Sequence, residues 1–121
     1  MENYIDALHN VLLEILIYVT EFCEKNNIEY CLVYGTALGA FRHGGFIPWD
    51  DDVDIAIPRR DYNRFINLME EEKGLYDIQY EKNENNYFLT FAKVRKKGTL
   101  FIENIADGLY KNNGVYIDVF P

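Results

Sequence analysis

The sequence predicts a mixed α/β (α+β) domain in which helices flank a mixed sheet. Apolar residues recur at helical spacing in some segments and alternate with polar residues in others, and the two kinds of segment follow one another along the chain. The chain has 121 residues, of which 49% are hydrophobic, enough apolar material for one core. No repeat or low-complexity segment interrupts this order. We therefore expect one domain over residues 1–121.

The first predicted elements are a long helix, a strand and a short helix. The long helix covers residues 4–23, because its apolar residues recur at intervals typical of an amphipathic helix. They are Tyr4, Leu8, Val11, Leu12, Ile15, Val19, Phe22 and Cys23. The apolar run at residues 28–34 predicts a buried strand that ends at Gly35. We expect Thr36 to cap a short helix that runs through Phe41.

A loop, a strand and another helix follow. Glycines and a proline within residues 44–48 predict the loop. Residues 53–57 then alternate, as in a strand with one buried face. Pro58 suits the start of a helix that we expect to stop at Gly74. The apolar stripe of this helix consists of Tyr62, Phe65, Ile66 and Met69.

Further strands complete the predicted sheet. They are expected at residues 77–81 and 88–95, with the polar turn 83–86 between them. Alternation at residues 115–120 predicts the last strand of the chain.

Composition excludes some partners. The net charge of -8 and the pI near 4.7 argue against a broad basic surface that would bind DNA or RNA.

The N-terminus lacks the basic region of a signal peptide. The apolar stretch 11–19 is broken by Glu14 and is far shorter than the roughly 18 residues of a membrane span. Cys23 and Cys31 are interpreted as small buried hydrophobes in a reducing compartment, so we expect a cytoplasmic protein without a transmembrane segment.

The acidic run at residues 50–54 is the main candidate site. Asp52 and Asp54 are two residues apart on a predicted strand, so their side chains share one face, with backbones about 7 Å apart. A divalent cation between them would remove their repulsion and leave positions open for phosphate oxygens, which favours Mg²⁺. Asp118 lies at the polar register of the last strand and would join them if the two strands were neighbours. We take Asp52, Asp54 and Asp118 as candidate catalytic and metal-binding residues.

Other interpretations of the acidic run remain open. A solvated acidic turn is the ordinary meaning of such a run, although the apolar alternation after it and the Gly35–Thr36 turn before it favour a metal and phosphate site. The spacing of Asp50, Asp52 and Asp54 also begins like a calcium loop. An EF-hand requires Gly at the position of Ile55, and its later positions also mismatch, which argues against calcium sensing.

Basic residues provide candidates for substrate binding. Arg42 and His43 end the short predicted helix, and Lys93 and Arg95 alternate on one face of a strand. Arg suits bidentate phosphate recognition and Lys suits a point-charge contact. Arg42, Lys93 and Arg95 are therefore candidate substrate ligands, although each alone is also compatible with a surface cation. Trp49 is interpreted as packing rather than as part of an aromatic cage for choline.

These residues carry a family resemblance. Residues 35–54, GTALGAFRHGGFIPWDDDVD, resemble the signature of the LicD family, which comprises bacterial phosphocholine transferases and relatives such as the fukutin-related proteins. Residues 60–62, 93–95 and 114–121 are similar to later blocks of that family in the expected order. The resemblance covers nearly the whole chain.

The resemblance implies a polymerase-β-like nucleotidyltransferase fold. In that fold a Gly-Ser or Gly-Thr turn, here Gly35 and Thr36, precedes a D-x-D strand, here Asp52 and Asp54, and Asp118 matches the third acidic residue. The stretch between turn and strand is longer than in typical nucleotidyltransferases, as it is in the LicD group. Family members usually continue well beyond the position of Pro121, so we expect a domain truncated at its C-terminus.

The function implied is Mg²⁺-dependent transfer of phosphocholine or a related phospho-substituent. The expected donor is a CDP-activated, CDP-choline-like nucleotide, and the expected acceptor is a hydroxyl on a cell-surface glycan such as lipopolysaccharide or teichoic acid. One alternative is nucleotidyl transfer from a nucleoside triphosphate, and another is a non-catalytic module that binds nucleotides or sugar phosphates. We expect this chain alone to bind the donor weakly and to transfer little.

Overall fold

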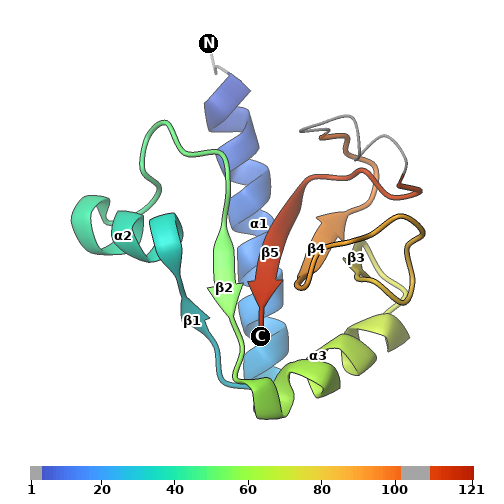
Figure 1. Ribbon diagram of the computed structural model, residues 1–121. Helices are drawn as coiled ribbons and strands as arrows, with labels where there is room; N and C mark the ends of the chain where they lie inside the picture. Colours follow the sequence, from blue (N-terminus) through green and yellow to red (C-terminus); the bar gives the residue numbers. More distant parts are fainter. Residues whose placement is uncertain (1–3, 102–109) are drawn as a thin grey trace.

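The computed structural model describes residues 4–101 and 110–121, which form one sheet with helices packed around it (Figure 1). The helices are α1 (Tyr4–Lys25), α2 (Tyr34–His43) and α3 (Arg59–Glu71). The strands are β1 (Cys31–Leu32), β2 (Asp54–Ala56), β3 (Tyr76–Gln79), β4 (Ala92–Lys96) and β5 (Tyr116–Phe120). The predicted fold class, an α+β domain with a mixed sheet, is confirmed.

The sheet places the last strand of the chain at its centre. Within the described residues it has five strands in the order β1-β2-β5-β4-β3. Strand β5 runs parallel to β2 and antiparallel to β4, and it therefore joins the two halves of the sheet. Side chains directly opposite each other on paired strands point to the same face, so this order determines which polar residues meet.

The core lies on one face of the sheet. Helix α1 runs behind the strands in Figure 1 and buries Leu12, Ile15 and Val19 together with strand residues such as Ile55 and Ile117. Helix α3 adds its predicted apolar stripe to the same cluster. Since alternate residues of β5 enter this core, Asp118 between them is presented on the opposite face. That face carries the candidate site.

The predicted strand at residues 28–34 is wrong in extent and burial. It is reduced to Cys31–Leu32, an edge strand that pairs with β2. Cys31 is exposed, in contrast to the prediction, because it lies on this short edge strand and on the face away from α1; Cys23 is buried as expected. The predicted strand at 88–95 begins only at Ala92, and Phe88 before it is 87% exposed.

Thr36 does not cap the short helix. Helix α2 begins earlier, at Tyr34, and its N-cap residue Val33 makes no side-chain capping bond. The Thr36 hydroxyl instead accepts a hydrogen bond from the backbone N–H of Asp54 at 2.8 Å. Trp49, expected to pack, is 77% exposed and forms an edge contact with His43.

None of the helices within residues 4–101 and 110–121 combines the length and the apolar character that a membrane crossing requires.

Candidate metal and phosphate site

Neighbouring strands bring Asp54 and Asp118 together. They are register partners in the parallel pair β2–β5, so their side chains project side by side from the same face. The backbone supports this pairing, since the N–H of Asp118 donates to the carbonyl of Val53 at 2.9 Å. The adjacency on which the sequence argument depended is therefore present, while the roles of these carboxylates in catalysis and metal binding stay predictions.

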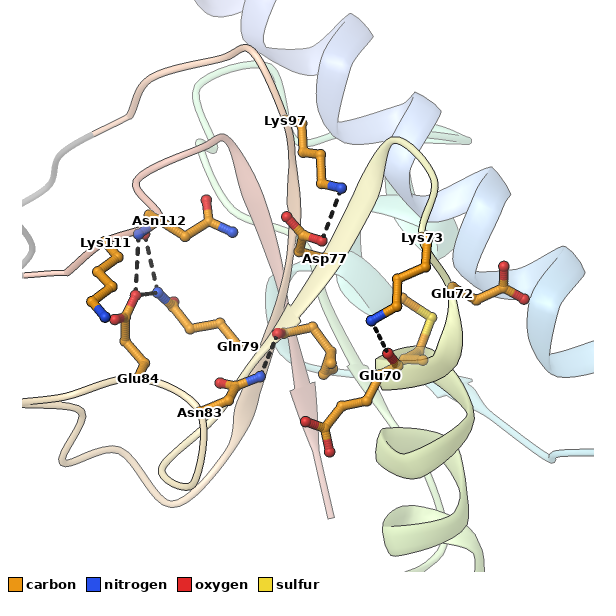
Figure 2. A pocket seen from close by; sticks show the side chains of 12 residues that line it. Glu70, Glu72, Lys73, Asp77, Gln79, Asn83, Glu84, Lys97, Lys111 and Asn112 are labelled. Carbon is orange, nitrogen blue, oxygen red and sulfur yellow. Dashed lines mark hydrogen bonds and ion pairs between the residues drawn. The ribbon is translucent and has the colours of Figure 1, made fainter.

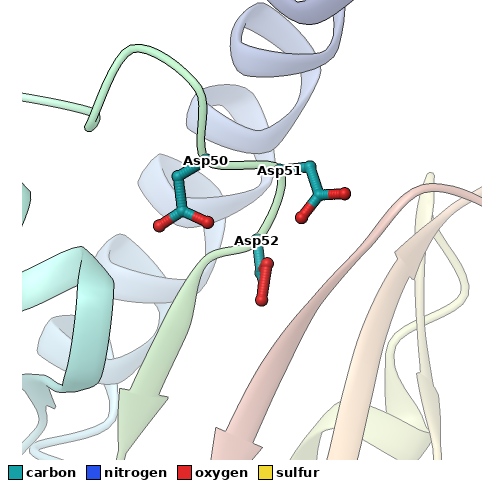
Figure 3. Close-up of side chains that lie close together, drawn as sticks. All are labelled: Asp50, Asp51 and Asp52. Atoms are coloured by element: carbon teal, nitrogen blue, oxygen red, sulfur yellow. The ribbon is translucent and has the colours of Figure 1, made fainter.

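Asp52 belongs to a closer acidic group than the one predicted. It lies on the turn that leads into β2, with Asp50 and Asp51, and one ligand oxygen from each of these residues lies within 4.8 Å of the other two. Asp50 turns toward α2, whereas Asp51 and Asp52 lie on the side of β5 (Figure 3). Within the described ranges, Asp52, Asp54 and Asp118 do not reach that mutual spacing. The sequence argument considered Asp50 only in the calcium-loop alternative and gave Asp51 no role, although the run of acidic residues was the signal.

The site concentrates negative charge that the protein neutralises only in part. Burial, followed by the hydrogen bond and charge of Asp51 and the charges of Asp50 and Asp54, raises the pKa of Asp52 to about 7. Burial, followed by the charge and hydrogen bond of Asp118, raises the pKa of Asp54 to about 7. Carboxylates that resist joint ionisation in this way are the groups that a divalent cation would stabilise.

The start of α2 borders the acidic turn. A Cβ atom added to Gly35 would lie 2.7 Å from Oδ2 of Asp50, so a larger side chain would force this turn to move. Tyr34 precedes it with φ of 55°, a left-handed conformation that is uncommon for a bulky residue. The first N–H groups of a helix lack intrahelical partners, and Gly35 and Thr36 lie in the first turn of α2. The arrangement suits a phosphate held by a metal at the adjacent carboxylates.

Lys93 contacts the site, but its ammonium already forms an ion pair with a carboxylate of the protein. It is the register partner of Asp118 on β4, and its Nζ lies 2.7 Å from Oδ1 of Asp118. The same ammonium lies 3.6 Å from the centroid of the Tyr116 ring. Lys93 thus binds an acidic residue of the site in the structure, whereas the sequence predicted a contact with substrate.

Arg95 and Arg42 lie apart from the carboxylates. Arg95 is fully buried, and it donates to Oε1 of Gln79 at 2.7 Å and to the carbonyl of Gly114 at 2.6 Å. Arg42 is exposed in the last turn of α2, seven residues and about 10 Å along the helix from Gly35. The structure brings neither residue to the site, and their predicted role in substrate binding stays untested.

Tyr62 supports the site in a way that sequence reasoning missed. Its apolar spacing predicted only a core residue. In the structure its hydroxyl donates to the carbonyl of Val119 at 3.0 Å and accepts from the N–H of Ala92 at 2.8 Å, so it bridges β5 and β4. This bridge lies one residue from the Lys93–Asp118 pair. No pattern in the sequence shows where a helix hydroxyl meets a sheet.

A small cavity opens beside the acidic turn. Its volume is about 230 Å³, and it reaches Thr36, Asp50 and Asp52 at one end. Its other walls come from α1, β1 and the loop at residues 44–47, and they are mostly apolar. Its size suits a small substituent rather than a whole nucleotide, because pockets for drug-sized ligands begin at about 300 Å³.

A second hollow lies elsewhere and is lined by none of the predicted site residues. It has a volume of about 430 Å³ between the end of α3, β3 and the segment near Asn112 (Figure 2). Its side chains largely satisfy one another, as in the hydrogen bond from Nε2 of Gln79 to Oε1 of Glu84 at 2.8 Å and the ion pair of Lys97 with Asp77. The carboxylate site, where the charges are not balanced, therefore remains the candidate site.

The fold and the site together define a class of protein: an α+β domain with an oxygen-rich acidic site, suited to a divalent cation and to phosphate, at the junction of two parallel strands. The profile described as LicD/FKTN/FKRP, nucleotidyltransferase domain, matches residues 27–121. The chain belongs to this family.

Curated relatives agree with this assignment. The chain is 48% identical over 112 residues to the lipopolysaccharide cholinephosphotransferase LicD of Haemophilus influenzae, a match that covers 91% of this chain and 41% of that protein. It is 41% identical over 109 residues to the ribitol 5-phosphate transferase FKRP of Mus musculus, which covers 86% of this chain and 19% of that protein. The chain thus spans less than half the length of these relatives.

Proposed function

We propose that the chain is the metal-binding and donor-binding part of a Mg²⁺-dependent transferase. It would move phosphocholine or a related phospho-substituent from a CDP-activated donor to a hydroxyl on a cell-surface glycan, with the reaction in the cytoplasm. The observation that carries the proposal is the side-by-side placement of Asp54 and Asp118 next to the acidic turn that contains Asp52. The names of the two relatives support transfer of a phosphate-linked substituent.

The residues present fit Mg²⁺. The donor atoms are carboxylate oxygens, which hard divalent cations prefer, and the raised pKa values of Asp52 and Asp54 support the proposal, because a bound cation would favour the ionised form of both. Asp54 and Asp118 would hold the ion between them, and Asp52 would have to move closer to join them, since the three carboxylates do not share ligand spacing in the described part of the chain. When bound, it would neutralise phosphate charge during transfer.

The chain's own residues would orient the donor. The start of α2 at Gly35 and Thr36 lies beside the acidic turn, and because the first N–H groups of a helix lack intrahelical partners, they would be available to a metal-bound phosphate there. The Thr36 hydroxyl holds the backbone of Asp54 and thereby fixes the position of that carboxylate. The cavity beside Asp50 and Asp52 is large enough for the small substituent attached to the phosphate.

The identity of the released nucleotide tests the proposal. The chain is incubated with Mg²⁺, CDP-choline and a glycan acceptor, and separately with CTP in place of CDP-choline. Release of CMP from CDP-choline supports transfer of the phospho-substituent, whereas release of pyrophosphate from CTP supports nucleotidyl transfer. Since this chain alone is expected to transfer little, a C-terminally extended version is tested in parallel. Binding of CDP-choline without either product in both would favour a non-catalytic binding module.

A further inference from the structure

We propose that Lys93 is a built-in cation of the carboxylate site. Its ammonium supplies positive charge directly beside Asp118, and it limits the substrate-free site around Asp54 and Asp118 to one divalent ion. The proposal rests on the metal site of the proposed function. It differs from the role predicted from the sequence, in which Lys93 contacts substrate.

Strand pairing sets the position of this lysine. Lys93 and Asp118 are directly opposite on antiparallel strands, so their side chains share a face at the shortest cross-strand distance. The ammonium reaches Oδ1 of Asp118 at 2.7 Å, and the two side chains are only 7% and 14% exposed. A charge-assisted bond of this length, shielded from water, holds the pair together.

Aromatic rings confine the ammonium at that point. Its nitrogen lies 3.6 Å from the ring centroid of Tyr116 and 5.4 Å from that of Phe91. Both distances are within the range of cation–π attraction. Lys96 on the same strand provides a contrast, because it reaches away from the site to Glu14 on α1 at 2.8 Å.

Charge balance and coordination both favour a single divalent ion at Asp54 and Asp118. Asp54 and Asp118 carry two negative charges when ionised, and Lys93 leaves a net charge of -1 at this pair, too little to favour a second divalent cation there; Asp50, Asp51 and Asp52 form the separate acidic group of the turn. Lys93 also bonds to Oδ1 of Asp118, so a metal shared with Asp54 would meet the other carboxylate oxygen without competition from the ammonium. A second divalent ion here would have to displace the ammonium or bring the negative charge of a substrate phosphate with it.

The test measures binding of Mn²⁺ to the substrate-free chain by electron paramagnetic resonance and calorimetry. Lys93→Met keeps most of the side-chain length but removes the charge. We expect it to bind one more ion per chain, or to bind the first at least about tenfold more tightly, because a positive charge within a few ångströms is lost. Lys93→Arg should behave like wild type. Lys96→Met is the matched control and should not change Mn²⁺ binding.

The outcomes separate the two proposals. If the wild-type chain bound Mn²⁺ and Lys93→Met bound it no better, or more weakly, the role proposed for Lys93 would be wrong. The metal site itself would stand. A wild-type chain with no more affinity for Mn²⁺ than Asp54→Asn would contradict the metal site and hence the proposed function. Unchanged Mn²⁺ binding with weaker CDP-choline binding in Lys93→Met would return Lys93 to a substrate contact.

A second measurement does not depend on the folding of the variant. A crystal structure of the wild-type chain soaked with Mn²⁺ should show anomalous density between Asp54 and Asp118, with the Lys93 ammonium still bonded to Oδ1. A manganese ion on Oδ1 in place of the ammonium would overturn the proposal.

Discussion

Two groups of charged residues lie on the same face of the sheet, only two residues apart on β4, yet they have opposite characters. Around Arg95, the guanidinium bonds to Gln79 and to the carbonyl of Gly114, and it lies over the ring of Tyr116 with its carbon 4.6 Å from the centroid. Around Asp54 and Asp118, like charges face each other and Lys93 offsets only part of the excess.

The difference separates structural charge from functional charge. A buried polar group that finds its partners inside the protein stabilises the fold and has little left to offer a ligand. Carboxylates held together without enough positive charge destabilise the free protein and gain most from a bound cation. The following predictions test whether the two groups differ in this way.

The largest effect is expected at Arg95. Arg95→Met should lower the free energy of unfolding by about 3 kcal/mol or more, because it leaves Gln79 and the carbonyl of Gly114 without their buried donor. Chemical denaturation measures the loss. Arg60→Met is the control, since Arg60 forms an exposed ion pair with Glu29 that should contribute at most about 1 kcal/mol. A loss confined to Mg²⁺ or nucleotide binding, with stability unchanged, would place Arg95 in the functional group instead.

The next effect is on metal binding. Asp54→Asn should weaken Mg²⁺ binding by about a hundredfold, equivalent to about 2.7 kcal/mol, while leaving the fold intact, because it removes a charge but keeps the shape of the side chain. Calorimetry compares it with Asp77→Asn, which changes a carboxylate on β3 that pairs with Lys97. Equal Mg²⁺ affinity in both variants would remove Asp54 from the metal site.

The bridge between strands should contribute less. Tyr62→Phe removes the hydroxyl that joins Val119 and Ala92, and we expect it to lower the free energy of unfolding by about 1 to 2 kcal/mol. Tyr30→Phe, which removes an exposed hydrogen bond to Glu24, is the control and should have little effect. If both variants lost equal stability, the bridge would have no special role.

A further expected effect is a pH dependence of stability in the metal-free chain. The folded-state pKa values of Asp52 and Asp54 are raised from 3.8 to about 7, so between these values the folded state binds more protons than the unfolded state. Stability from these groups is therefore present at low pH and is lost as pH rises from about 4 through about 7. Tm should fall over this range, and Asp54→Asn should flatten the fall.

Mg²⁺ provides the check on this pH dependence. It should raise Tm most near pH 8, where both carboxylates are ionised, and least near pH 5. If wild type and Asp54→Asn showed the same change of Tm with pH, with or without Mg²⁺, the two carboxylates would not hold their protons in the folded state.

The sequence by itself determined the class of fold, most of the core and the acidic character of the site. Helical spacing located α1 and α3, and alternation located β2 and β5, because side chains that face a common core repeat with the period of their element. The local run of acidic residues predicted one strand face for Asp52 and Asp54, whereas the structure has Asp54 on β2 and Asp52 on the turn before it.

Only the tertiary structure decided which of the charged residues act together. Strand order makes Asp118 a neighbour of Asp54 and places Lys93 across from it, and no local pattern encodes the pairing of residues so far apart in the chain. Lys93 and Arg95 look alike in the sequence, since both are basic and share one strand face. They differ because Lys93 bonds to a carboxylate on β5, whereas Arg95 bonds to a side-chain amide and a backbone carbonyl. Such partners are set by register and packing rather than by residue type.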